Sequence, residues 1–189
     1  MTWHDENLAK EMLDQEFKKH YELAREEIKV EMEDRFDYDT RFDFEYVIRE
    51  VVRQGHDITN VDGIRRVGYM LNAWAYALDL SYEIEKPSIS EMIDVAYLIE
   101  PEVNNNGFRK HQVYAGMEIM PDYREVRRLV ERLWESIDDL TALEFYKEFE
   151  EIHPFGDGNG RTGKVLFNWI NGTLLNPVLP PDYFGHGVP

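Results

Sequence analysis

The sequence predicts an all-α protein that is mostly helical and carries a single β-hairpin. Three observations indicate this fold class. Apolar side chains recur every three or four residues through most of the 189-residue chain, which is the period of an amphipathic helix. Several of these segments open with the spacing of a helix capping box. Residues 104–121 lack the helical period and instead carry Val, Tyr and Ile around a glycine, as a hairpin does.

Residues 1–57 are predicted to form an acidic helical extension with a regulatory or interaction role. Within residues 5–36 a narrow apolar stripe runs among Glu and Lys side chains, and it consists of Leu13, Phe17, Tyr21, Ala24 and Ile28. So thin a stripe packs on a partner surface, which is this chain, a second copy or another protein. Residues 34–43 are the best candidate for a hinge. Helical spacing then predicts a further helix over residues 44–52 that stops at Gly55.

Two helices are predicted in the middle of the chain. Asp62 is expected to cap the first, which spans about residues 63–80. The second opens at a capping box formed by Ser88 and Glu91 and ends at Pro101. Aromatic side chains at helical positions are expected to lie in the core, and these are Trp74, Trp134, Trp169 and Tyr146.

A hairpin and three more helices are predicted in the second half. The hairpin turns at Ala115-Gly116. Helices over residues 126–137 and 142–152 follow, and each is preceded by a capping box, formed by Asp122 with Glu125 and by Thr141 with Glu144. A last helix, over about residues 165–170, stops near Gly172.

Composition excludes several classes of function. The net charge of −17 argues against a nucleic-acid partner, because phosphate backbones attract basic surfaces. The chain has no cysteine, so thiol catalysis, disulfides and zinc–thiolate sites are excluded. No leader-like or membrane-spanning apolar run occurs, so we expect a cytoplasmic protein with no membrane partner, while export by a leaderless route stays open.

Chemistry-bearing residues concentrate in one stretch, His153-Pro-Phe-Gly-Asp-Gly-Asn-Gly-Arg-Thr-Gly-Lys164. Its glycines let successive backbone N–H groups converge on an anion, and a helix begins where the stretch ends. Arg161 and Lys164 add positive charge, and Asp157 is suited to a divalent cation that bridges phosphates. His153 can accept a proton from a nucleophile. The residues therefore predict a nucleotide-phosphate site with a general base beside it.

A P-loop competes for the same residues but fits them poorly. Residues 158–164 match the first seven positions of G-x-x-x-x-G-K-S/T. The eighth position is Val165, which cannot ligate magnesium. The segment before the loop, residues 142–152, has the period of a helix, whereas a P-loop follows a strand.

The whole stretch resembles the signature of the Fic (Fic/Doc) family, H-x-F-x-D/E-G-N-G-R-x-x-R, at every fixed position except the last, where Lys164 replaces Arg. The preceding Glu-Phe-Tyr-Lys-Glu-Phe-Glu-Glu-Ile is similar to the helix before the Fic loop. Gly107-Phe-Arg-Lys-His-Gln-Val-Tyr-Ala-Gly116 is similar to the Fic flap. The similarity covers roughly residues 64–177. On this basis residues 58–177 are expected to form the catalytic domain and residues 178–189 a C-terminal tail.

The resemblance implies a helical core with a β-hairpin flap and, as the activity, transfer of AMP from ATP to a protein hydroxyl with Mg²⁺. His153 would be the general base and Phe155 a buried anchor, while Asp157 would hold the metal. The phosphates would be bound chiefly by backbone N–H groups of the loop and by its cations, and Asn168 would lie near the nucleoside; the nucleotide-binding residues are thus Gly158, Asn159, Gly160, Arg161, Lys164 and Asn168. A target protein would add a strand along residues 108–119.

Two departures from the family pattern leave alternatives open. Lys164 keeps the charge of arginine but not its bidentate fork, so γ-phosphate orientation is expected to be weaker. Many relatives also carry an inhibitory helix with the pattern S/T-x-x-x-E-G/N, and residues 58–63 echo it weakly with Asp62 in place of Glu. Alternative functions are therefore transfer of another nucleotide or phosphate, AMP removal, or a non-catalytic or inhibited binding module that engages a partner or a second copy through residues 1–57.

Overall fold

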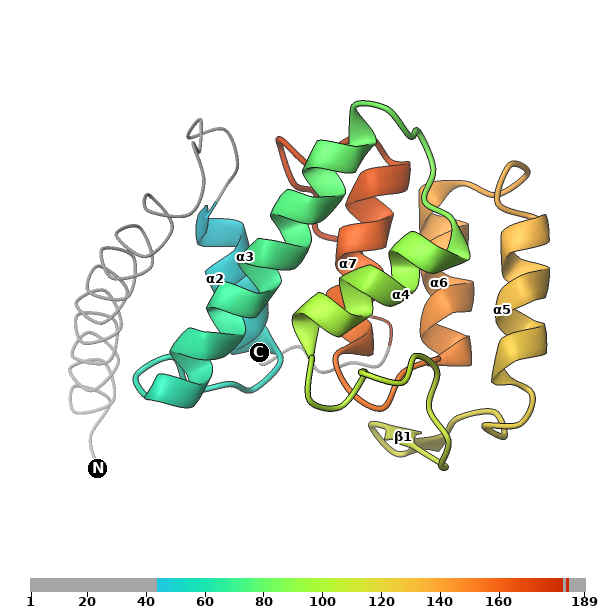
Figure 1. Cartoon of the computed structure of the whole chain (residues 1–189), viewed down its shortest axis with the longest axis horizontal. Helices are drawn as coiled ribbons and strands as arrows, with labels where there is room; N and C mark the ends of the chain where they lie inside the picture. The colour runs from blue at the N-terminus through green and yellow to red at the C-terminus, as the bar shows by residue number, and fades with distance from the viewer. Residues whose placement is uncertain (1–43, 182, 184–189) are drawn as a thin grey trace, which may run out of the picture.

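The computed structural model describes residues 44–181 and 183, and there it shows six helices and one two-stranded hairpin (Figure 1). The predicted all-α fold class is confirmed. The elements are α2 (Phe44–Arg53), α3 (Val61–Ser81), α4 (Ile89–Ile99), β1 (Tyr114–Ala115), β2 (Glu118–Ile119), α5 (Val126–Glu135), α6 (Ala142–Ile152) and α7 (Asn159–Ile170). The helix predicted over residues 5–36 and the hinge at 34–43 lie outside the described residues.

Helix α7 is the central element, because it packs against α3, α4 and α6 (Figure 1). Every residue from Arg161 to Trp169 is buried. A helix buried on all sides is normally apolar throughout. Here four polar residues share the interior with Val165, Leu166 and Phe167, namely Arg161, Thr162, Lys164 and Asn168. Buried polar groups are costly unless they are paired, so their presence in this helix indicates a functional site.

The core has two main parts, one on each side of α7. The first lies between α2, α3 and α7 and includes Val47, Val51, Met70, Trp74 and Trp169. The second lies between α4, α5, α6 and α7 and includes Met92, Val130, Phe145, Phe149 and Leu166. Trp74, Trp169 and Tyr146 are buried as predicted, and Trp134 packs at the edge of the second part. Helix α2 is thus integral to the core, while the predicted division of the chain after residue 57 stays a prediction.

Two of the predicted capping boxes are confirmed. Ser88 with Glu91 opens α4, and Thr141 with Glu144 opens α6. In each, the hydroxyl accepts from the helix backbone while the glutamate accepts from the backbone N–H of the capping residue.

The predictions for Asp62 and Asp122 are wrong. Asn60 caps α3, because its side-chain oxygen lies 2.9 Å from the N–H of Gly63, and Asp62 falls inside the first turn. Before α5, Asp122 accepts from the N–H of Arg124 at 2.9 Å and so closes a turn instead of a helix end. In both cases a competing local hydrogen bond decided which residue caps the helix, and the spacing of residues in the sequence does not reveal such a bond.

The hairpin is confirmed where it was predicted. Tyr114 pairs with Ile119 and Ala115 with Glu118, and Gly116 takes a φ of 58° at the turn. Tyr114, Met117 and Ile119 expose their side chains. In Figure 1 the hairpin lies beside the connection between α6 and α7. Among the described helices none combines the length and apolarity that crossing a membrane requires.

Candidate active site

His153 stands where α6 ends. Its backbone is left-handed, with φ 50° and ψ 62°, and among the described non-glycine residues it alone has a positive φ. Its ring Nδ1 lies 3.2 Å from the carbonyl oxygen of Glu150 and 3.8 Å from that residue's Oε2. Because a carbonyl can only accept, we assign the proton to Nδ1, which leaves the basic lone pair on Nε2. This is the tautomer that a general base acting through Nε2 requires.

Phe155 anchors the loop between His153 and α7. Its side chain is fully buried, and the centroid of its ring lies 5.9 Å from that of Phe108 and 6.4 Å from that of Phe149. Asn159 closes the loop with two bonds to the Phe155 backbone, accepting from its N–H at 2.8 Å and donating to its carbonyl at 3.0 Å. The Asn159 side chain thus shapes the loop, and its predicted contact with phosphate, through the backbone, stays a prediction.

Replacing Phe155 by Ala should destabilise the protein by about 3–5 kcal/mol, since it leaves a ring-sized cavity among buried aromatic residues. Chemical denaturation measures the free energy of unfolding. Phe155→Leu, which fills most of the space, is the matched control and should cost clearly less. An Ala variant as stable as the parent would mean that the loop is held in place without this ring.

The N-terminus of α7 is built to face an anion. Gly158 precedes it with a φ of 74°, and a Cβ there would lie 2.8 Å from Cγ2 of Ile99, so glycine is required on both counts. The first backbone N–H groups of a helix have no acceptor within the helix and carry partial positive charge. Backbone N–H groups here therefore suit phosphate oxygens, as the sequence predicted.

Arg161 is the side chain best suited to bind an anion. Its side chain is 1% exposed, and its Nη2 lies 2.6 Å from Oε1 of Glu100 and 3.8 Å from Oδ1 of Asp157. Its Nε and Nη1 have no hydrogen-bond partner among the described residues. A buried, charged donor left unpaired is costly. An anionic ligand that accepts from these two nitrogens would remove this cost.

Lys164, one turn further along α7, is already paired. Its ammonium forms a buried ion pair with Glu50 of α2, and Nη1 of Arg53 lies 3.0 Å from the other oxygen of Glu50. The Glu50 carboxylate is therefore already paired with the lysine that is expected to bind the terminal phosphate. Asp62, the residue in the weak echo of the inhibitory pattern, is exposed and instead pairs with arginines of its own helix.

Glu50 was not predicted from the sequence as a residue of the site. Tyr46 and Val51 stand where the inhibitory pattern has Ser or Thr and Gly or Asn, so the pattern does not match. A signal was nevertheless present, because Glu50 falls three residues after Val47 and thus on the apolar face of the predicted helix. A carboxylate on a buried face needs a buried cation.

The turn after α2 reaches the N-terminal end of α7, and this too was missed. The Gln54 amide lies over Gly160, since a Cβ on that glycine would be 3.0 Å from the amide nitrogen. The pKa of His56 is lowered, first by burial and then by the charges of Arg161 and Arg66. Glu50, Gln54 and His56 thus bring α2 and the turn that follows it against the N-terminal half of α7.

Asp157, the predicted metal ligand, lies at the mouth of the site. Its side chain is half exposed, and its Oδ1 accepts from the N–H of Gly158 at 2.6 Å. No group of three or more His, Cys, Asp or Glu suited to a metal occurs among residues 44–181 and 183. A single carboxylate still fits Mg²⁺, which is commonly held by one or two carboxylates together with substrate phosphates and waters.

Asn168 is occupied elsewhere. It is fully buried, and its oxygen accepts from the N–H of Val178 and the hydroxyl of Thr173, both at 2.7 Å. Its nitrogen donates to the Lys164 carbonyl at 2.9 Å and to the Val178 carbonyl at 3.1 Å. The side chain thus holds the segment that follows α7, and its predicted place near a nucleoside stays a prediction.

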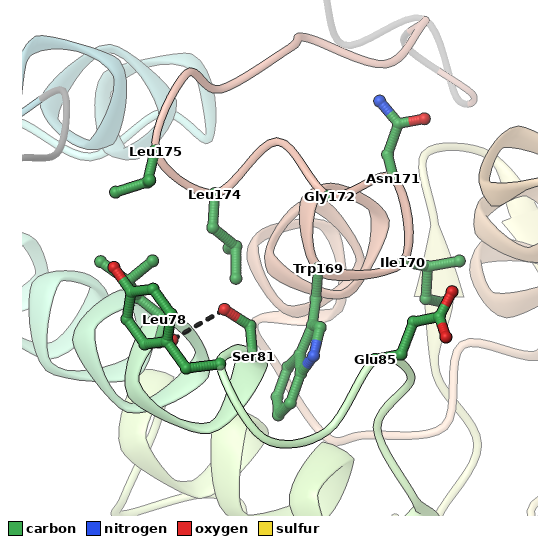
Figure 2. Close-up of a pocket in the computed structure, with 10 residues that line it drawn as sticks. Leu78, Ser81, Glu85, Trp169, Ile170, Asn171, Gly172, Leu174 and Leu175 are labelled. Carbon is green, nitrogen blue, oxygen red and sulfur yellow. Dashed lines mark hydrogen bonds between the residues drawn. The ribbon is translucent and has the colours of Figure 1, made fainter.

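A separate cavity of about 400 Å³ lies at the other end of α7 (Figure 2). Leu78 and Ser81 of α3 line it together with Trp169, Leu174 and Leu175, and the Ser81 hydroxyl is bonded to the Leu78 carbonyl. None of the predicted site residues contributes to it. The chemistry of the molecule is therefore concentrated at the N-terminal end of α7.

Comparison with known proteins agrees with the site. Residues 87–171 match the family model described as "Fic/DOC family". Proteins named "Protein adenylyltransferase Fic" from Drosophila erecta and Drosophila melanogaster are each 34% identical over 89 residues, which cover 42% of this chain and 17% of theirs. The match thus spans about a sixth of the length of these relatives.

Solved structures show the same fold. A Fic-1 structure from C. elegans is 20% identical, with a TM-score of 0.54, covering 92% of this chain and 62% of that one. A Fic family protein from Desulfovibrio desulfuricans G20 is 18% identical, with a TM-score of 0.51, covering 89% of this chain and 54% of the other. At these identities the likeness concerns the fold alone.

Proposed function

Because this chain belongs to the Fic/DOC family, whose fold and loop it carries, we propose that it is a protein adenylyltransferase that moves AMP from ATP to a Ser, Thr or Tyr hydroxyl of a target protein. One observation carries the proposal. Arg161, buried at the start of α7, keeps two side-chain nitrogens, Nε and Nη1, without a partner among the described residues, close to the loop that begins with His153. A base and an unsatisfied anion site at the two ends of one loop suit transfer to a hydroxyl.

The proposed reaction gives each of these groups a role. The target hydroxyl gives its proton to Nε2 of His153 as its oxygen bonds to the α-phosphorus, and the bond to the departing pyrophosphate breaks. Arg161 and the N–H groups of Gly158, Asn159 and Gly160 neutralise the β-phosphate side, where the leaving group gains charge. Mg²⁺, when held by Asp157, supplies further charge neutralisation between the phosphates.

The target is proposed to dock on the hairpin. Tyr114 and Ile119 lie opposite each other in the hairpin and are 65% and 68% exposed. Paired apolar side chains on neighbouring strands are normally covered by other apolar side chains. An extended target segment that adds along residues 108–119 would cover them and bring its hydroxyl toward His153.

A resting, inhibited form is favoured by one further observation, the buried pair of Glu50 and Lys164. A γ-phosphate and the Glu50 carboxylate would compete for the same ammonium. When the γ-phosphate is not bound by Lys164, the α-phosphorus of ATP is poorly aligned for in-line attack by the hydroxyl. We propose that the chain as it stands is restrained by α2 and becomes active when Glu50 is removed or displaced.

Labelled ATP tests the proposal. The wild-type protein and Glu50→Gly are incubated with Mg²⁺ and a cell lysate, using ATP labelled at the α- or at the γ-phosphate. We expect protein-bound label from the α position, more with Glu50→Gly and none with Glu50→Gly combined with His153→Ala. Label from the γ position alone would show phosphate transfer. No label from either, even with Glu50→Gly, would favour a non-catalytic binding module.

A further inference from the structure

We infer that Arg109 is a positioning residue, which locks the catalytic His153 and the target-docking hairpin into one rigid unit; the inference rests on the proposed function for the roles of these two parts. Arg109 lies in the segment that leads into the hairpin. Its side chain is 4% exposed, and burial lowers the pKa of its guanidinium. Among residues 44–181 and 183, its side chain makes four hydrogen bonds, and all four go to backbone carbonyl oxygens.

One set of these bonds holds the chain around His153. The Nε of Arg109 donates to the His153 carbonyl at 2.8 Å, and Nη2 reaches the Ile152 carbonyl at 3.4 Å. The backbone N–H of Arg109 donates to the Pro154 carbonyl at 3.0 Å. Three consecutive carbonyls, before, at and after the base, are therefore bound by one residue.

The other set holds both legs of the hairpin. Nη1 donates to the carbonyl of His111, which precedes β1, at 3.1 Å, and Nη2 donates to the carbonyl of Pro121, which follows β2, at 2.6 Å. The planar guanidinium thus fixes the base of the hairpin on one side and the end of α6 on the other. Lysine, with one nitrogen, cannot span both sets.

The end of α6 has particular need of this support. The last carbonyls of a helix have no partner within the helix and carry partial negative charge, which a guanidinium satisfies. His153 also adopts a left-handed backbone that a non-glycine residue keeps only when its surroundings determine it. If the peptide around His153 rotates, the imidazole leaves the Glu150 carbonyl and Nε2 changes direction.

A mechanistic consequence separates this role from simple stabilisation. Within the described chain, the hydrogen bonds of Arg109 go to residues outside the anion site, which is formed by α7, Glu100 and α2. Removing it should leave ATP binding intact but misalign the hydroxyl held on the hairpin with the base. Misplacement by about 1 Å can cost on the order of 10²-fold in rate, so kcat should fall with KM for ATP unchanged.

The experiment compares Arg109→Lys and Arg109→Met with Arg127→Met, each in the Glu50→Gly background. Arg127 is the matched control, since its guanidinium lies on the neighbouring Phe108 ring at 5.7 Å but is exposed. We measure the free energy of unfolding, ATP binding, kcat for transfer, and the ¹⁵N shifts of the His153 ring. For both Arg109 variants we expect kcat to fall by on the order of 10²-fold, while the ATP affinity stays within about twofold of the parent's. The ¹⁵N shifts of the His153 ring should no longer be those of a pure Nδ1–H tautomer. Arg127→Met should match the parent.

Two results would overturn the inference. One is unchanged kcat and unchanged His153 ring shifts in Arg109→Lys. The other is a loss of kcat that parallels losses of ATP affinity and unfolding free energy, as a purely structural role predicts. If the Glu50→Gly parent transfers no AMP at all, the proposed function fails. In that event the ring shifts still decide whether Arg109 positions His153.

Discussion

Replacing His153 by Ala should reduce the rate of AMP transfer by on the order of 10²–10⁴-fold, the usual contribution of a general base. The Nε2 lone pair is the proposed proton acceptor, and the bond between Nδ1 and the Glu150 carbonyl orients the ring. ATP binding should be unchanged, because the ring takes no part in the anion site at α7. Transfer is followed at saturating ATP and binding by calorimetry, both in the Glu50→Gly background.

Two comparisons make this result specific. His153→Asn removes the base but tolerates a left-handed backbone, so it should lose as much activity as His153→Ala with less effect on folding. Glu148→Ala, at an exposed position of α6, should behave as the parent. If His153→Asn retained full transfer, a base elsewhere would have to take the proton.

Replacing Glu50 by Gly should raise apparent ATP affinity and transfer by about 10- to 100-fold. A hydrogen-bonded contact to a charged group is worth about 1.5–3 kcal/mol, and each 1.4 kcal/mol corresponds to about a factor of ten. The variant frees the Lys164 ammonium to bind the terminal phosphate, and it leaves a buried charge that ATP itself neutralises. ATP should therefore stabilise Glu50→Gly against thermal unfolding more than it stabilises the parent.

Glycine in a helix is itself destabilising, so the control must carry the same change. Glu45→Gly does so on the same helix, where Glu45 is exposed and pairs only with Arg49 in the described chain. It should lose stability without gaining ATP affinity. Equal responses of the two variants to ATP would show that loosening α2, and not removal of the Glu50 carboxylate, opens the site.

The fold was largely predictable because its signals are local. Helical periods placed α2 to α6, and the boxes at Ser88 and Thr141 placed two helix starts within a residue. The predicted start of the last helix at about residue 165 is wrong, because α7 already begins at Asn159, within the glycine-rich stretch that shows no apolar period. The errors at Asp62 and Asp122 arose where a neighbouring group, the side chain of Asn60 or the N–H of Arg124, made the better hydrogen bond. Spacing alone cannot rank such competing bonds.

The site was predictable only where one short stretch holds all its parts. Residues 153–164 are contiguous, so their roles could be read together. Glu50 and Lys164 are 114 residues apart, and Arg109 and His153 are 44 apart. No local period links such pairs, and tertiary packing alone brings them into contact. For the same reason the contacts of the Asn168 amide with residues 173 and 178 could not be predicted.

We propose that the His153 loop transfers AMP to a hydroxyl. Mass spectrometry of a target protein after incubation with Glu50→Gly, Mg²⁺ and ATP tests it most directly. We expect an adduct with the mass of one adenylyl group on a Ser, Thr or Tyr residue, and no such adduct when His153→Asn is added. An adduct with the mass of a phosphate, or an adenylyl adduct that survives His153→Asn, would contradict it.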